Sequence, residues 1–155
     1  MTEKLYLDDL RVGRRLRSKS VTVSAQDIIR FARDSDPQYF HLDEEAAKDS
    51  MFGGLVASGW QTGALSIRLL IDSADPPLAG PVIGVEAEIA WKLPVRPGDS
   101  LRVEAEVTRI VCPRRYADRG FVSMNVATYN QRDDVVLTQN VKILAFRDPG
   151  RIGAG

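Results

Sequence analysis

The chain has 155 residues, of which 44% are hydrophobic and 27% are charged, as is typical of a soluble globular protein. Its 21 basic and 21 acidic residues give a formal net charge of zero, so the chain lacks the excess positive charge expected of a nucleic-acid-binding protein. The single cysteine, Cys112, excludes an internal disulfide and a cysteine-rich metal site. The length predicts one domain over residues 1–155, with a core over about residues 5–147 and a glycine-containing tail, residues 148–155, that frays.

The first ten residues, MTEKLYLDDL, lack the apolar run of a secretory signal peptide. No stretch of the sequence reaches the ~18 uncharged apolar residues that a membrane-spanning helix needs. We therefore expect a cytoplasmic protein that does not interact with membranes.

The N-terminal third is predicted to contain one strand and two short helices. Residues 14–23 end in the β-rich sequence Val-Thr-Val and predict the strand. A capping serine precedes a helix over about residues 25–34. Pro37 cannot continue that helix, which leaves residues 34–41 (DSDPQYFH) as a loop. The second helix begins at Asp43 with further acidic residues, as the helix dipole favours.

Residues 59–73 (GWQTGALSIRLLIDS) predict one long helix around which the domain is organised. Apolar residues recur at spacings of three and four, and further leucines leave little of the helix surface polar. Ser58 is a suitable N-cap, and Pro76 with Pro77 cannot continue the helix. Because a helix that is apolar nearly all round is normally buried, we expect the rest of the domain to wrap around it.

The second half of the chain predicts four consecutive strands. Apolar and polar residues alternate with a period of two, and a break in this alternation at residues 110–111 predicts a bulge or a strand end. Because the connections are short, neighbouring strands must be antiparallel, and the fold class is α+β with one sheet face packed on the helix. The predicted strands cover about residues 85–93, 101–108, 121–129 and 135–146.

The chain has one histidine, His41, and Asp36 lies five residues before it. Pro37 keeps the intervening segment from forming a regular helix, so the loop can bring the carboxylate and the imidazole together. Such a pair can hold one water molecule and activate it by general acid–base catalysis. From the residues alone, the alternative that Asp36 only caps a turn, with Asp34 as a competitor for any role, stays open.

The start of the long helix is a second candidate site. Backbone N–H groups in the first helical turn have no intrahelical partner and carry the positive end of the dipole. After Ser58, Gly59 would allow a ligand oxygen to approach, and the site could stabilise a thioester oxygen as it becomes an enolate. The alternative, that Gly59 only lets the helix pack tightly, is equally compatible with the spacing.

Three sequence blocks, in this order, resemble the MaoC-like dehydratase family, which includes the (R)-specific enoyl-CoA hydratases. They are DPQYFHLDEEAA at 36–47, FGGLVASGW at 52–60 and WKLPVRPGDSL at 91–101, and the similarity extends over about residues 5–147. The chain departs from the family pattern in two places. Gln38-Tyr39 stands where members often have Asn-Pro, and Ser58 stands where many members have histidine.

The resemblance implies the hot-dog fold, in which a curved antiparallel sheet wraps around one long helix, and a homodimer or a dimer of dimers. It implies acyl-thioester substrates carried on CoA or on an acyl carrier protein, with no metal and no cofactor beyond that carrier. Asp36 and His41 match the catalytic pair that adds water to a C2=C3 double bond to give an (R)-3-hydroxyacyl thioester. Gly59, preceded by Ser58, matches the family's donor to the thioester oxygen.

Two further groups of residues are candidates for substrate contacts. Four aromatic side chains could line an acyl tunnel, although all would also serve as core residues: Tyr39, Phe40, Phe52 and Trp60. Four cations could bind the phosphates of CoA, although they could equally be solvated residues at strand ends: Arg114, Arg115, Arg119 and Lys142.

Two other functions compete with hydration. A hot-dog thioesterase would more typically place its carboxylate on the central helix, and residues 59–70 contain no aspartate or glutamate. A non-catalytic acyl-thioester-binding subunit would not need both Asp36 and His41. Because one fold supports all three functions, the sequence predicts the hydratase from its site residues and not from its fold.

Overall fold

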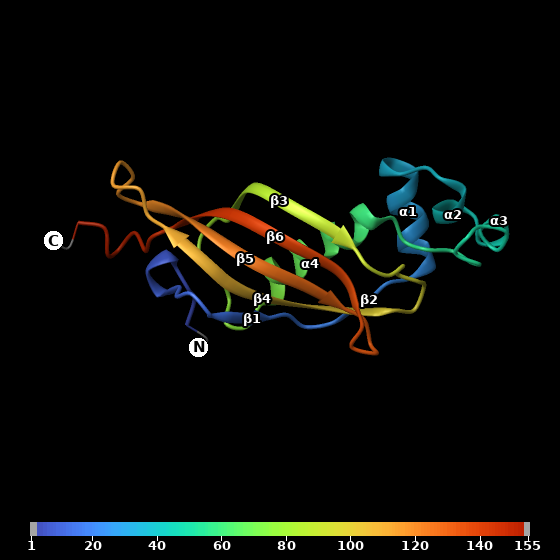
Figure 1. The fold of residues 1–155 in the computed structure, drawn as a ribbon, viewed down its shortest axis with the longest axis horizontal. Helices are drawn as coiled ribbons and strands as arrows, with labels where there is room; N and C mark the ends of the chain where they lie inside the picture. Colours follow the sequence, from blue (N-terminus) through green and yellow to red (C-terminus); the bar gives the residue numbers. More distant parts are fainter. Residues whose placement is uncertain (1–2, 154–155) are drawn as a thin grey trace.

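The computed structural model describes residues 3–153, and its sheet curves over one long helix (Figure 1). All strand pairs in the sheet are antiparallel, in the order β1-β4-β5-β6-β3, and β2 also pairs with β4. In chain order the elements are a 3₁₀ helix η1 (Leu7–Asp9), β1 (Arg15–Arg17), β2 (Val21–Thr22), α1 (Ala25–Ser35), α2 (Tyr39–Leu42), α3 (Glu44–Ala47), α4 (Gly59–Ser73), β3 (Ile83–Trp91), β4 (Ser100–Val111), β5 (Arg119–Tyr129) and β6 (Val135–Phe146). This is the hot-dog arrangement that the family resemblance implies.

The long helix α4 has the two ends that the sequence predicts, but it is covered on one side only. The sheet-facing side is buried and includes Ser66 and Leu69. On the opposite side, Trp60, Ile67 and Ile71 are 59%, 57% and 53% exposed. The expectation of a helix buried nearly all round was therefore wrong for the side of α4 that faces away from the sheet, because the sheet covers the other side only.

The edge strand β3 is the second place where burial differs from the expectation. Its alternating pattern predicted a half-buried strand, but it pairs only with β6 and is exposed over most of its length. Ile67 and Ile71 of α4 and Val85 of β3 border one groove of about 430 Å³. These three residues, together with Ile83, are called the α4–β3 apolar face below, and each is about half exposed or more.

The other strands follow the predictions closely, apart from local differences. β6 has the predicted bounds, and β5 begins two residues earlier than predicted. The bulge expected at residues 110–111 occurs as a register shift between Val107 and Arg109. The predicted strand over residues 14–23 is interrupted because Ser18 bonds to Val103 with both its backbone N–H and its hydroxyl oxygen, at 2.9 and 2.8 Å.

The helical segment before α4 is attached to one end of the sheet by its own hydrophobic cluster, visible at the right of Figure 1. Ile28 of α1, Leu101 of β4 and Leu137 of β6 are completely buried there. Burying such side chains contributes roughly 1.5–3 kcal/mol each relative to leaving them exposed. This cluster therefore holds α1–α3 against the sheet, next to the first turn of α4.

The segment predicted as a loop over residues 34–41 contains one helical turn, α2. α1 ends before Pro37, as expected. A new helical turn, α2, begins after Gln38, whose carbonyl accepts the His41 N–H at 2.9 Å. The next predicted helix is confirmed as α3, and the Asp43 side chain caps it by accepting N–H groups of Glu45 and Ala46.

The segment after β6 contacts the N-terminal segment through two ion pairs. Arg147 pairs with Asp8 at 2.6 Å, and Arg151 with Asp9 at 2.7 Å. Of the tail expected to fray, residues 154–155 lie outside the described residues. Within residues 3–153, no helix is both long enough and apolar enough to span a membrane.

Candidate active site

The structure brings Asp36 and His41 together beside the first turn of α4. Asp36 caps the C-terminal end of α1, where its N–H donates to the Ala32 carbonyl at 2.9 Å, and His41 lies in α2. The distance from Asp36 Oδ2 to His41 Nε2 is 3.3 Å, and the two side chains are only 18% and 7% exposed. The proximity that the loop was expected to allow is therefore present.

The orientation of His41 follows from a backbone carbonyl. His41 Nδ1 lies 2.7 Å from the carbonyl oxygen of Val56, in the segment that leads to α4. A carbonyl can only accept, so Nδ1 carries the proton and a neutral ring has its lone pair on Nε2. In this neutral form, Nε2 and the Asp36 carboxylate that it faces are both hydrogen-bond acceptors. A water molecule that donates one proton to each of them satisfies both groups.

The Asp36 carboxylate accepts hydrogen bonds at both oxygens. Gln38 Nε2 donates to Oδ1 at 2.7 Å, and the Ser58 hydroxyl donates to Oδ2 at 2.7 Å. Partial burial raises the pKa of Asp36, but the hydrogen bonds from Gln38 and Ser58, together with the positive charge of the His41 ring whenever that ring is protonated, outweigh burial and bring this pKa below its usual value. Asp36 therefore remains a carboxylate at neutral pH.

Ser58 links the pair to α4, and its removal tests that link. Its side chain is fully buried and also accepts the Trp60 N–H at 3.3 Å, so it caps the helix. We expect Ser58→Ala to lower the free energy of unfolding by about 1 kcal/mol at pH 7, as is usual for a lost serine cap. Denaturant titrations of both proteins measure this difference.

The pH dependence of that difference has a definite sign. The pKa of Asp36 is lower in the folded state than in the unfolded state, partly because the carboxylate accepts the Ser58 hydroxyl. The stabilisation from this bond is therefore fully present at a pH above the unfolded-state pKa of Asp36. It is lost as the pH falls through the folded-state pKa and the carboxylate takes up a proton. The destabilisation by Ser58→Ala should therefore shrink in acid. A difference that is constant from neutral to acid pH would contradict the contribution of the carboxylate bond.

The pair lies in a pocket of about 420 Å³ at the first turn of α4. Three of the four aromatic residues predicted to line an acyl tunnel, Phe40, Phe52 and Trp60, border this pocket. Tyr39 does not; it is 51% exposed and its ring packs edge-on against Phe40 with 5.1 Å between centroids. Asp34 lies instead in a separate groove between α1 and α4, so it does not compete with Asp36 at this site.

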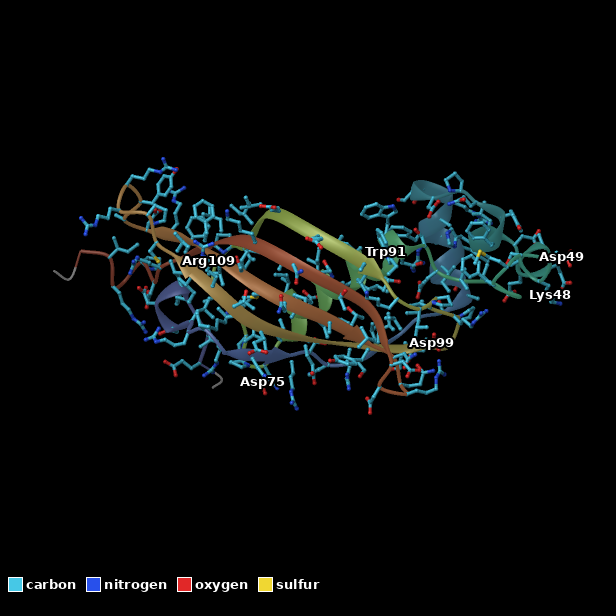
Figure 2. The ribbon with its side chains drawn as sticks, viewed as in Figure 1. Lys48, Asp49, Asp75, Trp91, Asp99 and Arg109 are labelled. Carbon is cyan, nitrogen blue, oxygen red and sulfur yellow. The ribbon has the colours of Figure 1, made fainter. Side chains whose placement is uncertain are left out.

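Gly59 lies in the same pocket, where its lack of a side chain has a visible structural reason. A Cβ atom at Gly59 would collide with the indole of Trp91. It would lie closest to Nε1, 2.7 Å from Cδ1 and 2.8 Å from Cε2. Figure 2 shows Trp91 at the end of β3, next to the start of α4. The packing explanation for Gly59 is therefore supported, and the role of its N–H as an oxygen donor stays a prediction.

The four predicted phosphate-binding cations do not border this pocket. Arg114 and Arg115 lie in the connection between β4 and β5, at the end of the sheet opposite α1–α3 (Figure 1). Arg119 pairs with Asp118 at 2.7 Å, and Lys142 lies 5.0 Å from the ring centroid of Phe121. Within one chain these residues are separated from Asp36 and His41, and their role stays a prediction.

Sequence reasoning missed several residues of the site. The Val56 carbonyl contacts His41 and the Gln38 amide contacts Asp36, and Trp91 and Lys92 form part of the pocket wall. Trp91 and Lys92 belong to the third sequence block of the family resemblance, which was the available signal for them. Val56 belongs to the second block, but its contact with His41 had no signature of its own, because every residue presents the same backbone carbonyl.

A curved sheet, a long helix and a carboxylate–imidazole pair at the start of that helix define a hot-dog domain with a hydro-lyase type of site. Comparisons with known proteins agree: the model of the MaoC-like domain family matches residues 9–131. The chain belongs to the MaoC-like dehydratase family.

The relatives extend over most of the chain. The chain is 36% identical to the uncharacterized protein YdeM of Bacillus subtilis (strain 168) over 92% of its own length and all of that protein. It is 32% identical to the 3-hydroxybutyryl-CoA dehydratase of Methylorubrum extorquens over 73% of its length and 70% of that protein. The crystal structure of a MaoC-like dehydratase from Rhodospirillum rubrum superposes with a TM-score of 0.88 at 48% identity, covering 94% of this chain and 99% of the other.

Proposed function

We propose that this protein reversibly adds water to the C2=C3 double bond of a 2-enoyl-CoA and forms an (R)-3-hydroxyacyl-CoA. The observation that carries this proposal is the Asp36–His41 pair, with the Nε2 lone pair facing the carboxylate inside a pocket at the start of α4. The similarity to a 3-hydroxybutyryl-CoA dehydratase supports a CoA thioester as substrate. The (R) configuration rests on the family resemblance.

The geometry suggests one course for the reaction. A water molecule donates one hydrogen bond to Asp36 Oδ2 and one to His41 Nε2, and Nε2 takes its proton as the water oxygen bonds to C3. The electron pair of the double bond moves toward the thioester oxygen, where the Gly59 N–H stabilises the negative charge. The protonated pair then supplies a proton to C2. Dehydration follows the same steps in reverse.

Incubation with a panel of 2-enoyl-CoAs tests the proposal. Enoyl-thioester absorbance and free thiol are followed together, and the product is analysed by chiral chromatography. Loss of the enoyl absorbance without thiol release, with an (R)-3-hydroxyacyl-CoA as product, would support hydration. Thiol release would instead show a thioesterase. Silence across short, long, branched and carboxylated enoyl-CoAs would overturn the proposal for CoA substrates.

We also propose that the α4–β3 apolar face pairs with a second copy of the chain, as the family resemblance implies. Val85, one of the residues of this face, is 50% exposed on an edge strand whose free side has no partner strand among residues 3–153. Val85→Asp should therefore shift the protein toward the monomer, because a charge in an apolar interface cannot be solvated.

Analytical ultracentrifugation measures this shift. Val12→Asp is the matched control, because Val12 is also exposed, at 66%, but lies before β1 and away from that face. The control should keep the mass of the wild type. A wild-type protein that is monomeric at micromolar concentration would contradict the pairing.

A further inference from the structure

Gln38 contacts both members of the catalytic pair, although it belongs to neither. Its side-chain amide donates to Asp36 Oδ1 at 2.7 Å, and its backbone N–H donates to the Asp36 carbonyl at 2.8 Å. Its own carbonyl accepts the His41 N–H at 2.9 Å, which closes the turn of α2. One residue thus connects the end of α1, where the carboxylate lies, to the turn that carries the imidazole.

The side-chain bond decides which oxygen of Asp36 is available. A carboxylate can rotate about its bond to Cβ, and Oδ2 already accepts from Ser58 while it faces His41 Nε2. With the Gln38 amide on Oδ1, rotation would break bonds at both oxygens. A hydrogen bond to a charged group is stronger than one between neutral groups, so this contact can hold the orientation although Gln38 is exposed.

The length of the side chain suits the backbone here. Gln38 has an extended conformation, with φ −102° and ψ 145°, and directly follows Pro37. From that position its amide reaches back over two residues to Oδ1. An asparagine is one methylene shorter. The sequence departure from the Asn-Pro pattern of the family thus coincides with a contact that uses the full length of glutamine.

We propose that Gln38 is a positioning residue that fixes the Asp36 carboxylate toward His41 and the reacting water. This inference rests on the proposed function, and it assigns Gln38 no contact with substrate. Of the titratable groups around Asp36, His41 on α2 has its Nε2 3.3 Å from Oδ2, Asp34 lies on α1, and Lys92 borders the same pocket after β3.

Gln38→Leu removes the amide and keeps a side chain of similar size. We expect kcat to fall about tenfold, which corresponds to one hydrogen bond to a charged group, with little change in KM. The acid limb of the kcat profile should move to higher pH, because the carboxylate loses a donor that favours its charged form. Gln38→Asn should resemble Gln38→Leu if the length of the side chain matters.

The chain supplies a matched control in Gln131. Its amide donates to Asp99 Oδ1 at 2.8 Å, which is the same kind of bond, but in the connection between β5 and β6 and outside the pocket. Gln131→Leu should leave kcat and its pH profile unchanged. An unchanged acid limb in Gln38→Leu, or an equal change in Gln131→Leu, would overturn the positioning role.

A second readout does not depend on activity. His41 is the only histidine, so its imidazole NMR signals are assigned without ambiguity. Ionisation of Asp36, 3.3 Å away, should appear as an acid step in these signals, and this step should move to higher pH in Gln38→Leu but not in Gln131→Leu. If the acid step shifts but no enoyl-CoA is hydrated, the positioning role of Gln38 is supported and the proposed reaction is contradicted. If enoyl-CoA is hydrated but the acid step does not shift, only the positioning role of Gln38 is contradicted.

Discussion

Asp36→Asn should lower the rate of enoyl-CoA hydration at least about a hundredfold, the lower range for loss of a general acid–base group. Asparagine keeps the size of the side chain and can still accept the Ser58 hydroxyl. Its amide, however, can donate a proton to His41 Nε2, which is 3.3 Å from Asp36 Oδ2. The lone pair that should take a proton from water would then be occupied. Steady-state kinetics at saturating substrate measure the loss.

Asp34→Asn is the control for this variant. Asp34 lies two residues earlier, in the last turn of α1, and borders a different groove, so its replacement should leave the rate within a fewfold of wild type. Circular dichroism and thermal unfolding show whether both variants stay folded. Near-wild-type hydration by Asp36→Asn would remove Asp36 from the mechanism.

His41→Ala should also reduce hydration at least about a hundredfold, because it removes the nitrogen that accepts the proton. The effect on folding is expected to be larger than for Asp36→Asn. His41 is 5% exposed, its Nδ1–H is the donor to the Val56 carbonyl, and its ring packs edge-on against Phe40 with 4.6 Å between centroids. Loss of a buried side chain leaves a cavity and an unpaired carbonyl, which costs roughly 1–3 kcal/mol for the carbonyl alone.

His41→Gln separates these two effects. Glutamine restores much of the volume and can donate to the Val56 carbonyl, but its amide nitrogen is not basic. We expect His41→Gln to unfold at a higher temperature than His41→Ala while hydrating no faster. If His41→Gln regained most of the wild-type rate, the ring would be needed for packing and not for proton transfer.

The sequence predicted the elements whose ends have local causes. Ser58 caps α4 and the prolines after it prevent its extension, so both helix ends could be predicted from local signals. The break in the first strand could not be predicted, because Ser18 bonds to Val103, which is 85 residues away. The exposure of α4 and β3 was also missed, since periodicity marks a residue as apolar without saying whether its own chain covers it.

For the site, the sequence predicted the pair but not its immediate surroundings. Asp36 and His41 are close in the chain, so a turn after Pro37 was enough to suggest that they meet. The tautomer of His41 depends on a carbonyl 15 residues further on. A backbone group carries no signature in the sequence, and only the fold shows where it points.

The aromatic wall of the pocket has a practical consequence for measuring ligands. The chain contains two tryptophans, Trp60 and Trp91, and both border the pocket, with their ring centroids 5.1 Å apart and their planes at 79°. Indole emission responds to changes in the polarity around the ring. All tryptophan fluorescence of this protein therefore originates at the pocket, and titration with an unlabelled acyl thioester can report its occupancy without an attached dye.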